Sequence, residues 1–246
     1  MKIYLRNPQN FNPEVLDFYK NFANIVPEQE ADIVVVNDFE ESNYPDKIVA
    51  RNSTGLDGIK AKEIISLRGE DLSDITAVAE LTLAMMTMVT RLFKKEEIRG
   101  KILGLIGSEG RIALQLKRMA EFMGMKVLGY DKKDSNKILK NLLKNSDIVS
   151  LHITADEKNR NFVDKQMFKR MKNGVIFLNS ARPWLVDTEA LKWALNNKLS
   201  CCWFDFEMPF QHKNMVTTRH QGGSTKQSRA KTEQMIAEKI KRLYYK

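Results

Sequence analysis

Apolar and polar positions alternate in a regular way from residue 101 to residue 217. Short apolar runs, typical of buried strands, are separated by amphipathic stretches with helical spacing. The predicted strands are 102–106, 126–130, 147–153, 174–179, 201–205 and 215–217, and the predicted helices lie near 110–123, 136–144, 164–171 and 188–196. This alternation predicts a parallel sheet with helices on both faces, and six strands is the count of a dinucleotide-binding sheet.

The segments on either side of this alternation have a different pattern. Residues 74–96 place apolar side chains at helical spacing and predict one long helix. The remaining predicted strands are 2–5, 32–36, 47–50 and 63–66, with a helix at 13–23 and a final amphipathic helix from 225 to 243. We therefore expect two domains, a smaller one of residues 1–75 plus 226–246 and a sheet domain of residues 76–225.

Composition limits the class of protein. Of 246 residues, 43% are hydrophobic and 29% are charged, which is ordinary for a globular chain and excludes a disordered one. The net charge of +9 would permit a nucleic-acid partner, but the basic residues are scattered, so we expect no nucleic-acid surface. Cys201 and Cys202 are adjacent and have no other cysteine to pair with, which indicates a reduced, cytoplasmic protein. We also expect no metal site, no signal peptide and no membrane span.

The strand predicted at 102–106 runs into a glycine-containing turn and then a helix. Glycines in such a turn let backbone amides approach a pyrophosphate, whose charge the helix N-terminus favours. The chain has Gly107-x-x-Gly110-x-x-Ala113, with one residue more between the first two positions than the usual G-x-G-x-x-G/A spacing. Taken alone, this loop fits a dinucleotide site and a plain strand–turn–helix equally well.

Asp131 ends the next predicted strand and strengthens the dinucleotide interpretation. An acidic residue at this separation from the glycines accepts hydrogen bonds from the adenosine ribose. It also repels a 2′-phosphate, so it favours NAD over NADP, although Lys132 and Lys133 follow directly and weaken that preference. The alternative is a residue that only begins a loop and has no ligand.

A series of motifs makes a family resemblance specific. After the helix motif Val78-Ala79-Glu80-Leu81 come the phosphate loop, Tyr130-Asp131, SDIVSLH (146–152), MKNGVIFLNSAR (171–182), Leu185-Val186-Asp187 with Ala190-Leu191, and TRHQGGST (218–225). In this order and over this length, the chain resembles the D-isomer-specific 2-hydroxyacid dehydrogenases. In the first 75 residues, only STGLDGI (53–59) is similar to the substrate-side loop of that family.

The resemblance implies a fold and a reaction. The implied fold is α/β, with a doubly wound parallel-sheet (Rossmann) cofactor domain, a smaller flavodoxin-like substrate domain and the active site in the cleft between them. The implied reaction exchanges a hydride between nicotinamide and a D-2-hydroxy acid or 2-keto acid. The implied cofactor is NAD, with NADP less favoured. The alternative is a catalytically weak or inactive nucleotide-binding relative that acts as a sensor or partner protein.

The resemblance also assigns residues to roles. Arg182 would grip the substrate carboxylate with its planar guanidinium, and His220 would move a proton to or from the substrate oxygen. Thr54 and Gly55 would add backbone hydrogen bonds to the substrate. For His152 a structural role is the alternative to contact with the cofactor. The implied cofactor residues are Gly107, Gly110, Arg111, Ile112, Asp131, His152, Ser180, Ala181, Asp205 and Gly222.

The chain departs from the family pattern at the third catalytic function. The family has an acidic residue directly before a proline, but here Met208 precedes Pro209 and Glu207 is displaced by one position. Either Glu207 serves as the partner of His220 after local rearrangement, or this function is missing. The arm that helps to form the family's dimer is also reduced after residue 96, although a homodimer is still the expected state.

Overall fold

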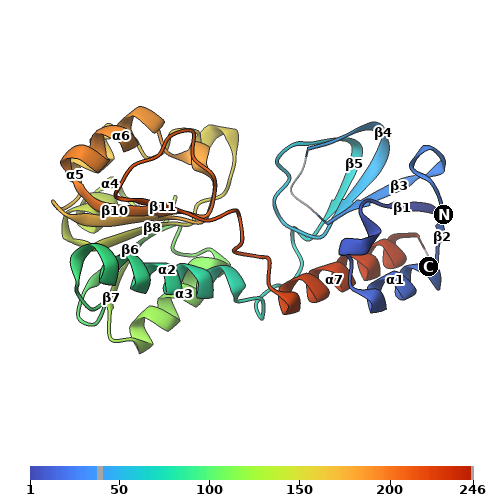
Figure 1. The fold of residues 1–246 in the computed structure, drawn as a ribbon, viewed down its shortest axis with the longest axis horizontal. Coiled ribbons are helices and arrows are strands. Elements are labelled where there is room, and N and C mark those ends of the chain that lie inside the picture. Colours follow the sequence, from blue (N-terminus) through green and yellow to red (C-terminus); the bar gives the residue numbers. More distant parts are fainter. Residues whose placement is uncertain (38–40, 245–246) are drawn as a thin grey trace. The chain divides into compact units, whose positions relative to one another are not determined.

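The computed structural model describes residues 1–37 and 41–244, which form two compact units (Figure 1). Unit 1 joins Met1–Leu72 to the C-terminal segment that begins at Thr225, and unit 2 is Ser73–Ser224. Each unit contains one sheet in which all paired strands run parallel. The structure thereby confirms the predicted α/β class.

The sheet of unit 2 has the six predicted strands. They are β6 (Ile102–Ile106), β7 (Lys126–Tyr130), β8 (Ile148–Leu151), β9 (Val175–Asn179), β10 (Leu199–Phe204) and β11 (Met215–Thr217). Their order is β11-β10-β9-β8-β6-β7, so the chain moves from β6 to β7 in one direction and then returns to place β8 on the other side of β6. Ligands of open parallel sheets bind outside the carboxyl ends of the strands at such a reversal point.

Helices cover both faces of this sheet. One face carries α2 (Ala77–Lys94) and α3 (Arg111–Phe122), and the other carries α4 (Asn136–Asn145), α5 (Lys165–Arg170) and α6 (Thr188–Asn197) (Figure 1). The strand side chains alternate between two cores, as a pleated sheet requires. Ile176 and Trp203 belong to the core under α2 and α3, whereas Phe177 and Phe204 belong to the other core.

The sheet of unit 1 has the flavodoxin-like order β2-β1-β3-β4-β5. Its strands are β1 (Lys2–Leu5), β2 (Asn24–Ile25), β3 (Ile33–Val36), β4 (Ser42–Arg51) and β5 (Ile59–Ser66), and its helices are α1 (Pro13–Lys20) and α7 (Lys226–Tyr244). The two helices pack on each other, although one lies near each end of the chain (Figure 1).

The connection between β4 and β5 differs from the sequence prediction. Both strands are longer than predicted and pair in parallel from Ser42–Ile59 to Arg51–Ser66, so only residues 52–58 return the chain to the start of the sheet. Parallel neighbours are usually joined by a longer crossover that contains a helix. Here the extended parts of β4 and β5, through Tyr44, Ile59 and Ala61, cover the buried Val34, Val36 and Val49.

Candidate active site

The turn after β6 is shaped to bring backbone amides to a ligand. Gly107 has a φ of 87°, and a Cβ on it would lie 2.7 Å from the carbonyl carbon and oxygen of His152. Only glycine fits this position, because any larger residue would combine backbone strain with a clash against main chain. The helix α3 begins directly after Gly110, which is its N-cap residue. Because glycine has no side chain that could cap the helix, the first backbone amides of α3 remain available to an anion.

A cavity of about 570 Å³ opens beside this turn, at the carboxyl ends of β6, β7 and β8. Its volume is in the range of small-molecule and cofactor sites. Four of the predicted cofactor residues line it, namely Gly107, Gly110, Asp131 and His152. Its other lining residues are Glu109, Tyr130, Lys132, Ile153, Thr154, Asp156, Lys158, Asn159 and Phe162.

Hydrogen bonds hold the Asp131 side of the cavity. The Asp131 carboxylate accepts from the backbone amides of Glu109, at 3.1 Å, and Lys132, at 2.8 Å. The Asp131 amide in turn donates to the Asp134 carboxylate at 2.7 Å. Asp131 therefore lies at the position predicted for a ribose-binding carboxylate, and its conformation is set before any ligand binds.

His152 forms the floor of the cavity near Gly107. Its Nε2 lies 2.9 Å from the hydroxyl of Ser150, and its backbone amide donates to the carbonyl of Ile106. Burial of the ring lowers the pKa of His152 from 6.5 to about 4, so the imidazole is neutral at pH 7. His152 also lines the cavity, so a structural role and contact with the cofactor both stay predictions for this residue.

The remaining predicted cofactor residues lie elsewhere in unit 2. Arg111 is the first residue of α3; its guanidinium donates to the carbonyl of Ile75, and burial lowers the pKa of this side chain. Ile112 packs against the core under α2 and α3. Ser180 and Ala181 follow β9; the Ser180 hydroxyl is buried and has no hydrogen-bond partner among the described residues.

Arg182 and His220, the two predicted catalytic residues with the clearest roles, contact one aromatic ring. The Arg182 guanidinium carbon lies 5.6 Å from the ring centroid of Phe206, and the His220 ring centroid lies 4.6 Å from it. Phe206 directly follows Asp205 and is only 8% exposed. The structure thus brings together a cation and an imidazole that are 38 positions apart in the sequence. No sequence signal had indicated that Phe206 contacts both of them.

The backbone around Arg182 is fixed by Asn179 at the end of β9. The Asn179 amide nitrogen donates to the carbonyl of Arg182, and its oxygen accepts from the amide of Ala181, at 2.8 and 2.9 Å. Arg182 is extended, with φ −150° and ψ 145°, as expected before Pro183. Trp184 stacks with Arg160, whose guanidinium carbon is 5.1 Å from its ring.

The segment that carries His220 is anchored by Asp205. This carboxylate is 1% exposed and accepts hydrogen bonds from the Thr218 hydroxyl at 2.7 Å and from the amides of Gln221 and Gly222 at 2.8 and 2.7 Å. A Cβ on Gly222 would lie 2.9 Å from the Asp205 Oδ2, so glycine is required there. His220, between the anchored residues, has a left-handed φ of 51°. The sequence singled out Asp205 and Gly222 as cofactor residues but did not reveal that they bind each other.

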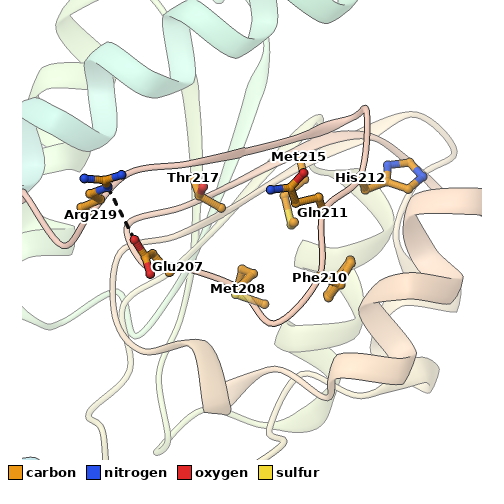
Figure 2. A pocket seen from close by; sticks show the side chains of 8 residues that line it. All are labelled: Glu207, Met208, Phe210, Gln211, His212, Met215, Thr217 and Arg219. Atoms are coloured by element: carbon orange, nitrogen blue, oxygen red, sulfur yellow. Dashed lines mark ion pairs between the residues drawn. The ribbon is translucent and has the colours of Figure 1, made fainter.

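Glu207 lies outside this buried group. Its carboxylate is 79% exposed and forms an ion pair with Arg219 at 3.5 Å (Figure 2). Both residues line a second pocket, of about 610 Å³, together with Met208, Phe210, Gln211, His212, Met215 and Thr217. Figure 2 shows the ion pair at one end of this pocket and His212 at the other. The predicted pairing of Glu207 with His220 stays a prediction.

The substrate-side loop of unit 1 is held by arginines. Thr54 and Gly55 follow β4, and their carbonyls accept from Arg68 Nε at 2.9 Å and from the Ser53 hydroxyl at 3.1 Å. Arg51, which is 3% exposed, donates to the carbonyl of Asp57 at 3.0 Å. These contacts give the loop a defined shape within unit 1.

Residues 1–37 and 41–244 contain two cysteines, three histidines and several long helices. No three His, Cys, Asp or Glu side chains in these ranges gather in a way that could hold a metal ion. No helix there is long and apolar enough to cross a membrane. Cys201 and Cys202 are buried and unpaired, and burial raises the pKa of Cys201 to about 11.

The fold, the glycine turn and the cavity at the strand reversal define a dinucleotide-binding α/β protein. A family model described as D-isomer specific 2-hydroxyacid dehydrogenase, NAD binding domain, matches residues 79–222, which is more than half of the chain. The chain therefore belongs to the D-isomer-specific 2-hydroxyacid dehydrogenase family, a family of oxidoreductases, as its motifs predicted. The prediction of NAD as cofactor is confirmed at the same time.

Relatives support this assignment along most of the chain. The sequence is 29% identical to D-3-phosphoglycerate dehydrogenase of Methanocaldococcus jannaschii over 264 aligned positions, covering 87% of this chain but 50% of that protein. It is 31% identical to hydroxypyruvate reductase of Thermotoga maritima over 261 positions, covering 88% of this chain and 85% of that one. The chain thus spans about half the length of the first relative and most of the second.

Solved structures show the same fold. NAD⁺-bound 3-phosphoglycerate dehydrogenase of Entamoeba histolytica matches with a TM-score of 0.81 at 20% identity, covering 98% of this chain and 94% of that one. D-lactate dehydrogenase of Aquifex aeolicus, complexed with NAD and lactic acid, matches with a TM-score of 0.78 at 22% identity, covering 99% and 95%. At these identities the likeness concerns the fold.

Proposed function

We propose that this protein is an NAD-dependent dehydrogenase that interconverts a D-2-hydroxy acid and the corresponding 2-keto acid. The proposal rests on one observation, that Arg182 and His220 both contact the ring of Phe206. The reaction needs a cation for the substrate carboxylate and a proton-transfer group for the substrate oxygen, and these two side chains have the required chemistry.

Each residue has a defined part in the proposed mechanism. Arg182 binds the substrate carboxylate through paired N–H groups and orients the carbon that reacts. His220 gives a proton to the carbonyl oxygen during reduction and removes it during oxidation. The Phe206 ring, which is 8% exposed, packs against both side chains and helps to position them. The nicotinamide, when bound, supplies or accepts the hydride.

The proposed cofactor residues follow from the cavity and the strand ends. Backbone amides of the turn at Gly107 and Gly110, together with the first amides of α3, hold the pyrophosphate. The Asp131 carboxylate accepts hydrogen bonds from the ribose hydroxyls. Ser180 and Ala181, after β9, complete the nicotinamide side. On the substrate side, Thr54 and Gly55 donate backbone amides to the carboxylate.

Glu207 is the proposed carboxylate partner of His220, and it fills this role only if its side chain leaves Arg219. Its high exposure leaves it free of packing that would oppose such a movement. The matched test compares Glu207→Gln with Arg219→Gln. If Glu207 assists His220, the first substitution lowers kcat, whereas the second leaves kcat unchanged or raises it.

Turnover with a panel of 2-keto acids tests the proposed function. Hydroxypyruvate, glyoxylate and phosphohydroxypyruvate are each mixed with NADH, and NADH oxidation is followed by absorbance. We expect turnover with at least one acid, a fall in kcat of about 10²-fold or more in His220→Ala, and an increase mainly in KM for Arg182→Lys. NADH binding without turnover of any acid would defeat the enzyme and support a nucleotide-binding sensor or partner protein.

We also propose a homodimer formed through α2 and α3. These helices pack on each other and expose apolar side chains, with Leu92 63% exposed and Phe122 90% exposed. Exposed apolar groups on neighbouring helices favour association with a second copy in a twofold arrangement. Sedimentation should show a dimer that Phe122→Glu converts to a monomer. A monomeric wild-type protein would exclude this assembly.

The buried, unpaired cysteines support a reducing, cytoplasmic location.

A further inference from the structure

Glu109 lies in the stretch between Gly107 and Gly110 that is one residue longer than the usual spacing, and it lines the cavity beside Asp131. Its backbone amide donates to the Asp131 carboxylate at 3.1 Å. Its side chain turns the other way and pairs with Lys133, with 2.5 Å between Oε1 and Nζ. One residue therefore contacts both the carboxylate that would bind the ribose and a lysine that follows it.

The side chains at this end of the cavity carry charges of both signs, and Asp134, which accepts from the Asp131 amide, adds a further carboxylate. Asp131 and Glu109 carry negative charge, and Lys132 and Lys133 carry positive charge. The Lys133 ammonium donates a hydrogen bond to the Glu109 carboxylate, and this bond raises the pKa of Lys133. An ammonium in this region that lacked Glu109 would be a suitable partner for a phosphate, since cations beside the ribose accommodate the 2′-phosphate of NADP.

We propose that Glu109 determines cofactor specificity by occupying Lys133 and by adding a second negative charge beside Asp131. A 2′-phosphate entering this end meets the carboxylates of Asp131 and Glu109, and Lys133, which directly follows the cavity-lining Lys132, is already paired with Glu109. The ribose of NAD carries a hydroxyl instead, which Asp131 accepts without a charge conflict. The inference rests on the NAD-binding domain and not on the proposed dehydrogenase activity, because it concerns nucleotide affinity alone.

A double-mutant cycle tests this role. The dissociation constants of NADH and NADPH are measured by fluorescence titration on the full chain, for the wild type, Glu109→Gln, Lys133→Gln and the double variant. We expect Glu109→Gln to tighten NADPH binding by about tenfold, as removal of one like charge at close range predicts, and to change NADH binding by less than about twofold. When Lys133→Gln is the starting protein, Glu109→Gln should increase NADPH affinity by less than half as much as it does in the wild type. The increase should also become smaller as salt is added.

A matched control separates this effect from a general change in surface charge. Glu121→Gln removes one exposed carboxylate, paired with Lys117, near the far end of α3, about 15 Å along the helix from the loop. It should leave both affinities unchanged. Equal shifts of NADH and NADPH in Glu109→Gln, or a gain that persists in full when Lys133 is also replaced, would overturn the proposal. Absence of turnover would not change the dissociation constants of NADH and NADPH. The proposed role of Glu109 and the proposed dehydrogenase activity can therefore be refuted independently.

Discussion

Removing the Asp205 carboxylate should release the segment that carries His220. In Asp205→Ala, the Thr218 hydroxyl and the amides of Gln221 and Gly222 lose their acceptor inside a site that is 1% exposed. Each unsatisfied buried donor costs about 1–3 kcal/mol, and the desolvation of the carboxylate, which is removed with it, offsets part of the sum. We expect a loss of about 3 kcal/mol in the free energy of unfolding. Asp205→Asn keeps one acceptor oxygen and should lose about half as much.

Two measurements on the same samples make the test specific. Urea unfolding gives the free energy, and the buried Trp203, whose indole nitrogen donates to the Thr218 hydroxyl at 3.1 Å, is a fluorescent reporter close to the change. Hydrogen exchange followed by mass spectrometry gives the protection of the amides in 218–224, which should fall in both variants under native conditions.

Asp187→Ala is the matched control for this prediction. Asp187 caps α6 by accepting from the amide of Ala190 at 2.6 Å, and its loss should cost about 1 kcal/mol without changing exchange in 218–224. If Asp205→Ala unfolds at the urea concentration of the wild type, or if exchange in 218–224 is unchanged, Asp205 does not hold this segment and the reasoning is wrong.

Two further predictions concern the cofactor cavity. Gly107→Ala places a Cβ 2.7 Å from the His152 carbonyl at a positive φ, so titration with NADH should show affinity weakened by about tenfold or more, and unchanged affinity would contradict the assigned close approach. Burial lowers the pKa of His152 to about 4, so between pH 6.5 and pH 4 the unfolded chain binds a proton at this residue and the folded chain does not. The free energy of unfolding is therefore unaffected by His152 above pH 6.5 and decreases as the pH falls below it. Urea unfolding should show that the free energy of unfolding falls by about 2 kcal/mol between pH 7 and about pH 5, and that His152→Gln abolishes this decrease. An equal decrease in that variant would show that protonation of His152 is not its cause.

The amino-acid sequence predicted the strands and α-helices of unit 2 to within about three residues at each end. Strands β6, β7 and β11 have the predicted bounds, because apolar runs bounded by glycine or polar turns have only one way to bury themselves between helices. Unit 1 was less well predicted. The outer halves of β4 and β5 are rich in polar residues, and they are strands because they pair with each other and cover Val34 and Val36. Pairing between distant segments leaves little mark on local hydrophobic pattern.

The candidate site divides in the same way. The identities of Gly107, Asp131, Arg182 and His220 came from motifs, since each chemistry needs that residue type at a set distance from a strand end. Only the tertiary structure decided that Phe206 contacts both Arg182 and His220, that Asp205 anchors the segment of His220, and that Glu207 and Glu109 pair with Arg219 and Lys133. Such contacts depend on ångström-scale distances between the ends of different strands, and those distances are set by packing of the whole sheet.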